Sequence, residues 1–182
     1  YGGIRTQVNR TLRLAEGFVD LLRAESDTLH RQHCTLEQLA QEAAERCWPQ
    51  AQAAQVHMVQ RGTHSDVCRV HGDAELLIRA MVNMLGNALR HSPPGSTVEV
   101  CVARDADTDQ VTWAVRDHGA GMNAQALADL LLSLDTHTRV RPRHPGTRSR
   151  THGLGLGLLV AHTVVARHAG ELHVMAAPGQ GC

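Results

Sequence analysis

This sequence contains no lysine, so all 18 of its basic residues are arginine, and they balance 18 acidic residues. The resulting net charge of zero argues against binding of nucleic acid through whole-domain electrostatics. No run of about eighteen apolar residues is present, which excludes an ordinary membrane-spanning helix within these residues. The five cysteines are odd in number and lack Cys-x-x-Cys spacing. We therefore expect reduced thiols and no disulfide framework.

The 182 residues, of which 42% are hydrophobic, are enough for one solid core with an appendage. Because the chain begins at Tyr1 with no initiator methionine, we expect a part of a longer protein. Residues 4–29 have the periodicity of a long helix with a seam for a partner helix or a second chain. Thr35 opens a capping box that predicts a second helix to about Cys47, which Pro49 should end or kink.

Beyond residue 55 the pattern alternates between strands and helices. Two short strands are expected around the turn at 61–65, and then a helix that starts at Asp73 and stops before Pro93. Clean alternation predicts strands at 97–104 and 110–116, joined by a turn at 105–109. Further elements are expected at 123–134 (helix), 155–168 (helix) and 172–175 (strand).

Asn83 and Asn87 lie four residues apart in the helix expected after Asp73. Four residues is just over one turn, so both carboxamides project from the same side. A different face carries the expected buried stripe, which consists of Ile78, Val82, Leu85 and Leu89. Asparagine has poor helix propensity, so two on one face indicate a compensating function.

Two glycine-containing strings follow the asparagines. The first is Asp117-His118-Gly119-Ala120-Gly121, and the second, Gly153-Leu154-Gly155-Leu156-Gly157-Leu158, leads into a predicted helix. Backbone N–H groups at a helix N-terminus bind phosphate well, because the helix dipole also favours anions. Either string alone is a weak signal. The ordered set of polar helix, glycine turn and glycine-rich helix start indicates a nucleotide pocket.

These three motifs, in this order, resemble the catalytic and ATP-binding domain of bacterial sensor histidine kinases. Asn83 to His91 match the family's N box, Asp117 to Gly121 its first glycine box, and residues 153–158 its second. The resemblance covers about residues 55–182. It implies the Bergerat ATP-binding fold, an α/β two-layer sandwich that gyrase, mismatch-repair and chaperone ATPases share. Residues 12–23 resemble the second helix of the family's dimerisation and phosphotransfer hairpin.

The resemblance implies ATP and Mg²⁺ as ligands and assigns roles to particular residues. Asn87 would offer an amide oxygen to Mg²⁺, a hard cation that prefers oxygen ligands. Asn83 would line the phosphate end, and Asp117 would accept a hydrogen bond from the adenine amino group. The implied nucleotide-binding residues are Asn83, Asn87, Arg90, His91, Asp117, Gly119, Gly121, Gly153, Gly155, Leu156, Gly157 and Leu158.

The same resemblance divides the chain into a helical segment at 1–50 and a catalytic ATP-binding domain at 51–182, with a lid at about 122–152. Five arginines between residues 139 and 150 would clamp phosphates or dock a partner, or else form a solvated loop. The family's aromatic F box is absent, since Leu130 to Leu134 contain no phenylalanine. Either leucines anchor this lid or it is loose.

The implied activity is transfer of the ATP γ-phosphoryl group to a histidine. The sequence has no His-acid motif followed by proline, so the acceptor histidine is expected outside these residues, and the fragment alone should not autophosphorylate. A gyrase-like ATPase and a non-catalytic ATP-binding or dimerisation module are the alternatives. The ATPases place a glutamate four residues before the metal-binding asparagine. Here that residue is Asn83, whose amide cannot act as a general base, which favours transfer over hydrolysis.

The partners implied by the family are a response regulator receiver domain and a second copy of the chain, paired through the N-terminal helical hairpin. Nucleic acid is not an expected partner. The implied location is the cytoplasm, as a domain of a sensor that in many relatives is anchored in a membrane.

Overall fold

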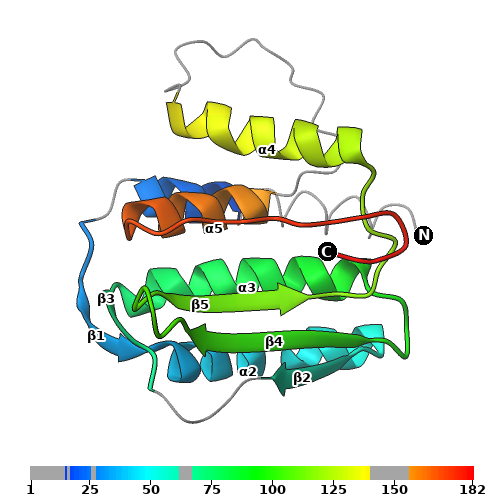
Figure 1. The fold of residues 1–182 in the computed structure, drawn as a ribbon, viewed down its shortest axis with the longest axis horizontal. Helices are drawn as coiled ribbons and strands as arrows, with labels where there is room; N and C mark the ends of the chain where they lie inside the picture. Colours follow the sequence, from blue (N-terminus) through cyan, green and yellow to red (C-terminus); the bar gives the residue numbers. More distant parts are fainter. Residues whose placement is uncertain (1–14, 16, 26–27, 62–66, 140–155) are drawn as a thin grey trace.

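The computed structural model describes residues 15, 17–25, 28–61, 67–139 and 156–182 (Figure 1). The helical residues 17–25 are here called the N-terminal helix. The elements that follow are β1 (Gln32–Thr35), α2 (Leu36–Ala54), β2 (His57–Arg61), β3 (Arg69–Gly72), α3 (Ala74–His91), β4 (Thr97–Arg104), β5 (Val111–Arg116), α4 (Ala124–Arg139) and α5 (Leu156–Arg167).

The described strands form two small sheets that lie against helices, which confirms the expected α/β sandwich. β4 is the central strand of the larger sheet, parallel to β2 and antiparallel to β5. β1 and β3 form a separate antiparallel pair. Helices α2 and α3 cover one face of the larger sheet, while α5 and then α4 lie farther from it (Figure 1). The two strands expected around residues 61–65 exist, but each pairs with a different partner.

Helix α3 supplies the centre of the main core. It starts at Asp73, whose side chain caps the helix by accepting a hydrogen bond from Leu76 N over 3.1 Å, as the sequence predicted. Of the predicted stripe, Ile78, Leu85 and Leu89 are fully buried, and Val82 packs against the same cluster. The other contributors come from α2 and β4, including Leu39, Ala43, Cys47, Ala51, Val98, Val100 and Val102.

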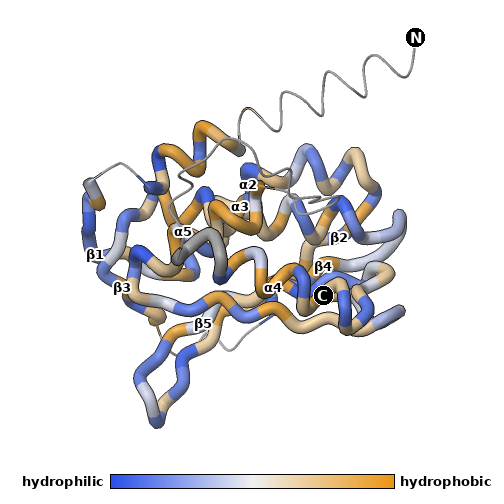
Figure 2. The backbone as a smooth tube through the Cα atoms, turned by 90° about the horizontal axis from the view of Figure 1, so that it is seen from above, coloured by the Kyte–Doolittle hydropathy of each residue, from blue (hydrophilic) through white to orange (hydrophobic). Residues whose placement is uncertain are grey.

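A second, smaller core joins the N-terminal helix to α3 and α5. Ala24 is completely buried there, among Leu76 and Ala80 from α3 and Val160 and Val164 from α5. Figure 2 shows α3 and α5 as largely hydrophobic segments that run close together. The N-terminal helix is therefore packed onto the sandwich by the same apolar burial that holds α3 and α5 together.

The sequence misplaced the end of α2 and did not predict β1. Helix α2 does not end at Cys47, because it continues through Pro49 to Ala54. Pro49 and Glu45 are both exposed, so water can satisfy the carbonyl that proline leaves without a donor. Thr35 stands at the N-cap without a side-chain hydrogen bond, and it also ends β1, a strand that the sequence did not predict.

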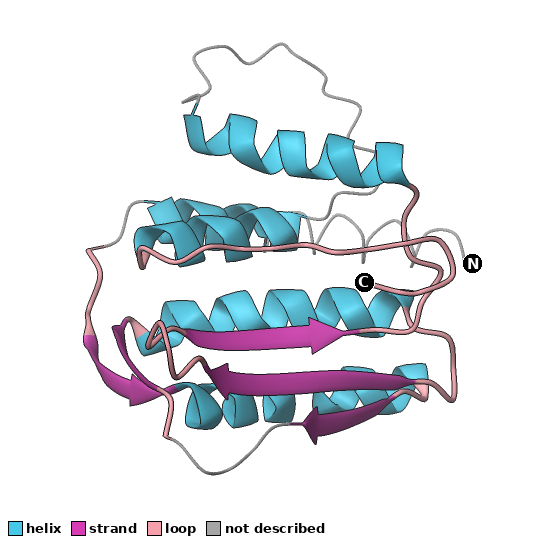
Figure 3. Cartoon of the chain, viewed as in Figure 1, coloured by secondary structure: helices cyan, strands magenta, loops and turns pink. Residues whose placement is uncertain are grey.

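The helix predicted for 4–29 is described as helical only to residue 25, and residues 28 and 29 are not helical. The final strand predicted for Leu172 to Met175 is also absent from the described residues. That segment runs as an extended loop beside the helices (Figure 3). Its side chains alternate between half-buried and exposed, as in a strand, but no described strand pairs with it.

We predict that Leu85→Ala lowers the free energy of unfolding by about 2–5 kcal/mol, because Leu85 is fully buried in the main core. Urea denaturation followed by circular dichroism measures this change. The matched control is Leu132→Ala, the same truncation at a side chain that is 67% exposed. It should change the unfolding free energy by less than about 1 kcal/mol. Equal losses in both variants would contradict the assigned core.

Candidate functional site

The two carboxamides of α3 project from one side of the helix, as predicted, and both side chains are half-buried. Asn83 turns its nitrogen back onto its own helix, where Nδ2 donates to the Arg79 carbonyl over 3.0 Å. Asn87 Oδ1 accepts a hydrogen bond from Arg90 Nη1 over 3.3 Å, on the exposed side of the helix. A long, exposed bond of this kind is weak, so this oxygen can exchange its partner for a ligand at little cost.

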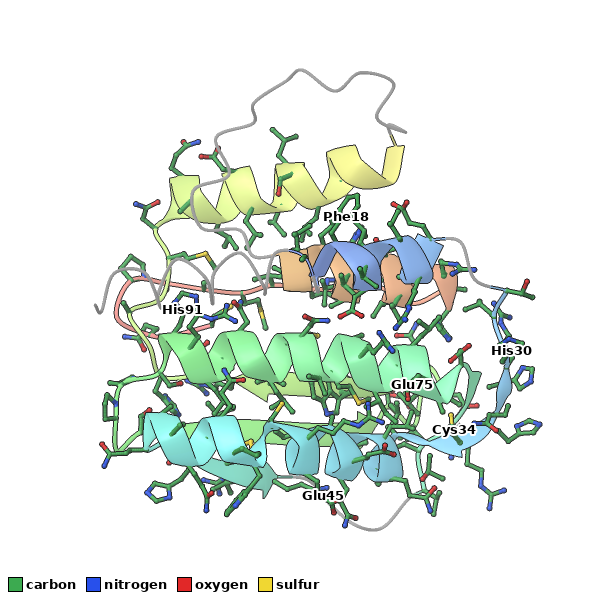
Figure 4. The ribbon with its side chains drawn as sticks, turned by 180° about the vertical axis from the view of Figure 1, so that it is seen from behind. Phe18, His30, Cys34, Glu45, Glu75 and His91 are labelled. Atoms are coloured by element: carbon green, nitrogen blue, oxygen red, sulfur yellow. The ribbon has the colours of Figure 1, made fainter. Side chains whose placement is uncertain are left out.

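The turn that contains Asp117 packs directly onto the end of α3. Asp117 follows β5 and is buried, and its Oδ1 accepts a hydrogen bond from Gly119 N over 2.8 Å. A Cβ added at Gly119 would lie 2.4 Å from the carbonyl oxygen of His91. Glycine is therefore required there for the turn to approach the last residue of α3. His91 itself is exposed at this end of the helix (Figure 4).

The C-terminal turn, residues 177–182, closes over Asp117 from the other side. Cys182 O accepts a hydrogen bond from Asp117 N over 2.8 Å, and Ala120 O accepts one from Gly179 N over 2.7 Å. Gly121 has a φ of +65°, and a Cβ there would lie 1.9 Å from the Ala177 carbonyl oxygen. Backbone from three segments thus surrounds one buried carboxylate.

The first turn of α5 meets the amide side of α3. A Cβ added at Gly157 would lie 2.6 Å from Asn83 Oδ1, so the glycine brings the two helices into close contact. Leu156 and Leu158 are half-buried in the same turn. Gly153 and Gly155 lie outside the described residues, as does most of the arginine-rich part of the lid. Of the segment predicted as a lid, about 122–152, the structure describes α4, which is longer than the helix predicted for 123–134.

Leucines occupy the positions on α4 where the family resemblance would place an aromatic residue. Leu130 and Leu134, four residues apart on α4, are 3% and 5% exposed, whereas Leu132 points to solvent. Residues at this spacing lie on one face of a helix. This face of α4 is therefore held by buried leucines, which favours the first of the two alternatives for lid anchoring.

The arrangement presents complementary chemistry at one end of the β4–β5 sheet. Asp117 Oδ1 is used within the turn, and within the described part of the chain no hydrogen bond reaches Oδ2. Among the described residues, only Glu37 Oε2 and Trp113 Nε1 are fully buried without a partner, so Asp117 Oδ2 remains accessible to a donor from a ligand. The first N–H groups of α5 have no partner within their own helix and so favour an anion. A cavity of about 350 Å³ lies elsewhere, lined by Val67, Arg69, Arg104, Asp109 and Val111.

The sequence reasoning missed the contribution of Gly181 and Cys182 to the candidate site. A Cβ at Gly181 would lie 2.0 Å from the Asp117 carbonyl oxygen, and this glycine has a φ of +76°. Burial, and to a smaller extent the Asp117 carboxylate, raises the pKa of the Cys182 thiol. The Gly-Gln-Gly string at 179–181 signalled a tight turn, but not its position against Asp117.

Comparison with protein families identifies one matching model. Residues 72–182 match the family described as "Histidine kinase-, DNA gyrase B-, and HSP90-like ATPase". The match begins just before α3 and includes every candidate residue named above.

Similar curated proteins include the sensor protein IrlS of Burkholderia pseudomallei, which is 32% identical over 176 residues. That alignment covers 94% of this chain but only 35% of IrlS. The adaptive-response sensory kinase SasA of Synechococcus elongatus is 25% identical over 179 residues, which cover 97% of this chain and 44% of SasA. The chain thus spans less than half the length of these two relatives.

Solved structures show the same fold. The full-length ShkA structure in complex with AMPPNP matches 99% of this chain and 36% of its own length, with a TM-score of 0.73 and 21% identity. The histidine kinase AdeS of Acinetobacter baumannii matches 99% of this chain and 79% of its own, with a TM-score of 0.66 and 15% identity.

We predict that Gly121→Ala destabilises the protein more than Gly95→Ala does. Both glycines have positive φ, so alanine costs about 1–2 kcal/mol of backbone strain at either position. Only at Gly121 does the new Cβ also collide with backbone, whereas nothing lies within 4 Å of a Cβ at Gly95. The extra loss should be about 1–3 kcal/mol in thermal or urea unfolding. Equal losses would mean that the Asp117 turn is not packed as described.

Proposed function

The chain belongs to the family of histidine kinase-, DNA gyrase B- and HSP90-like ATPases, as an ATP-binding catalytic domain of the sensor histidine kinase type, and we propose that it binds Mg-ATP between α3, the Asp117 turn and the start of α5. The observation that carries this proposal is the convergence of three sequence motifs, far apart in the chain, at one end of the sheet. Transfer of the γ-phosphoryl group to a histidine of the parent protein is part of the same proposal.

At the adenine end, Asp117 is the proposed anchor. Its Oδ1 is fixed by Gly119 N, so the side chain cannot turn away and Oδ2 is available for the adenine amino group. Gly119 and Gly121 let the turn lie against His91 and Ala177 without side chains that would fill the space for the base. His91, exposed at the end of α3, is proposed to lie against the adenine plane.

At the phosphate end, the proposed contacts are Asn83, Asn87, Arg90 and the start of α5. Asn87 Oδ1 faces a cation already, the Arg90 guanidinium, and amide oxygen is a suitable ligand for Mg²⁺. Bound Mg²⁺ would neutralise phosphate charge. Arg90 would then be released toward the phosphates, where its guanidinium can form charge-assisted hydrogen bonds. The glycines at 153–157 are proposed to bring backbone N–H groups to the phosphate oxygens.

Transfer is favoured over hydrolysis by the chemistry of Asn83. This side chain is a carboxamide with its nitrogen engaged by the Arg79 carbonyl, so it can orient groups but cannot take a proton from water. The phosphoryl group is instead proposed to pass to a histidine outside these residues, and from there to the receiver domain of a response regulator. Positioning and charge neutralisation would then supply most of the catalysis.

The remaining proposals concern the parent protein. Residues 1–50 are proposed to include the end of a dimerisation hairpin, although α2 crosses residue 50 and its buried side chains belong to the core of α3. The catalytic domain is proposed to work in the cytoplasm. None of the helices in the described ranges is long and apolar enough to span a bilayer.

We predict that Asn87→Ala reduces the affinity for Mg²⁺ with a non-hydrolysable ATP analogue by about tenfold or more, while the Mg²⁺-free affinity changes less. The reason is loss of an oxygen ligand without loss of the adenine contacts. Calorimetric titration with and without Mg²⁺ measures both affinities. Gln110→Ala, which removes an exposed carboxamide beside the β4–β5 turn, serves as the control and should bind like the parent. Parental affinity in Asn87→Ala would remove Asn87 from the site.

We also predict that the protein forms a dimer through the outer face of the N-terminal helix. Phe18, Val19 and Leu22 are 55%, 45% and 47% exposed there, an unusual apolar stripe for a helix in water (Figure 4). Phe18→Asp combined with Leu22→Asp should give a monomer in light scattering. Gln52→Asp, which places the same acid at an exposed position of α2, should leave the dimer intact. If the unsubstituted chain stays monomeric in light scattering at high concentration, pairing through this helix is refuted.

A further inference from the structure

Two histidines face each other across the two-stranded sheet that β1 and β3 form. In the antiparallel register of this sheet, His33 lies directly opposite His71. The centroids of the two imidazole rings are 4.9 Å apart, and the ring planes are tilted by 38°. Side chains that lie directly opposite each other project from the same face of a sheet, so both imidazoles belong to one surface.

This surface is the outer face of the small sheet. His33 and His71 are both exposed. Cys34, the next residue of β1, projects from the other face and packs against the main core. The β1–β3 sheet and the C-terminal turn lie at opposite ends of the molecule (Figures 1 and 2). The histidine pair is therefore separate from the candidate site around Asp117.

The spacing of the two rings suits a metal ion that is shared between them. Imidazole nitrogens bind Cu²⁺, Ni²⁺ and Zn²⁺, in the case of zinc at about 2.0–2.1 Å. Two such nitrogens on one ion are therefore roughly 3.0–3.5 Å apart. Rings with centroids 4.9 Å apart can each direct one nitrogen into the space between them. The paired strands hold the two side chains at this separation before any ion binds.

We propose that His33 and His71 together bind a divalent transition-metal ion, of the class of Cu²⁺, Ni²⁺ and Zn²⁺, on the outer face of β1 and β3. Within the described ranges, no set of three or more His, Cys, Asp and Glu residues is placed to hold a metal ion. The described chain thus supplies two ligands, and water completes the coordination. Binding is consequently weaker than at a closed structural site with four protein ligands.

The charges near the pair select against hard cations. Arg69 precedes His71 by two residues on β3 and so projects from the same face, and Arg31 lies immediately before β1. Arg31 is engaged elsewhere, because its Nη2 donates to the Arg167 carbonyl over 3.1 Å. Both arginines are exposed, so water and salt screen their repulsion of a cation. The pair therefore binds through coordination bonds and not through charge attraction, which favours transition metals over Mg²⁺.

A shared ion ties β1 to β3. β1 lies between the N-terminal helix and α2, and β3 leads into α3. Because the two imidazoles are close together only when the strands are paired, the free energy of metal binding adds to the stability of that pairing. The ion therefore fastens the segment before α2 to the start of α3.

The test uses the untagged chain and Ni²⁺ in calorimetric titration, with thermal unfolding as a second readout. His33→Gln and His71→Gln should each weaken Ni²⁺ binding by at least about tenfold, because even outer-shell partners of metal ligands are worth about 10–100-fold in affinity. Ni²⁺ should raise the Tm of the parent more than that of either variant. His57→Gln, the same substitution at an exposed position of β2, should behave like the parent.

A gain of affinity provides a second test that does not depend on removing a ligand. Arg69→His adds a third imidazole on the same face of β3 and should bind Ni²⁺ at least about tenfold more tightly than the parent. Arg69→Gln removes the same positive charge without adding a ligand, so it should tighten binding much less. Excess Mg²⁺ should leave Ni²⁺ binding to the parent unchanged.

Three outcomes overturn the proposal: absence of Ni²⁺ binding to the parent, equal affinity in the parent and both glutamine variants, or loss of affinity in only one of the two. Equal tightening in Arg69→His and Arg69→Gln, or competition by Mg²⁺, also contradicts a site made of imidazoles. Each of these results leaves the proposed function intact, because the histidine pair is not part of the nucleotide site.

Discussion

One face of α3 changes from apolar to polar side chains at the level of the first turn of α5. The rest of the structure depends on this change. Leu76, Ala80, Asn83 and Asn87 follow one another at helical spacing along that face. The first two are buried under α5 and the N-terminal helix, whereas the asparagines lie at and beyond its first turn. The apolar half fixes the position of α5 by burial. In the polar half, Asn83 meets the first turn of α5 at Gly157, whereas Asn87 lies one turn farther along α3, where its oxygen accepts a hydrogen bond from Arg90.

The turn that contains Asp117 differs from the polar half of α3, because its functional side chain, the Asp117 carboxylate, belongs to a buried residue. A buried carboxylate is costly unless it is hydrogen-bonded, and here the described chain provides one N–H to one of its oxygens. The glycines at 119, 121 and 181 are what allow three backbone segments to approach it. Its second oxygen has no partner among the described residues but keeps access to the surface, so a donor such as an amino group can reach it and add a hydrogen bond.

The sequence predicted those parts of the fold whose signals are local. Helix α3, its cap at Asp73 and the alternation of β4 and β5 follow from spacing and end residues alone. β1 was missed because its four residues form a strand only by pairing with β3, about 37 residues later. The glycine strings predicted contact residues, but the position of Cys182 beside Asp117 depends on how the C-terminal turn folds back. Pro49 is tolerated because that part of α2 faces water.

The N-terminal helix has two apolar sides, one exposed and one packed against α3 and α5. The periodicity of the sequence did not show which residues belong to which side. Phe18 and Leu22 belong to the apolar seam predicted from spacings of four and three residues, and both are exposed. Gly17, Leu21 and Ala24 instead meet α3 and α5. Adjacent residues differ by about 100° around a helix, so the two sets occupy different sides of the same cylinder. A second chain can therefore pair with the outer side while the inner side stays docked. Dimer formation through the outer side and packing of the inner side on α3 and α5 are therefore not alternatives.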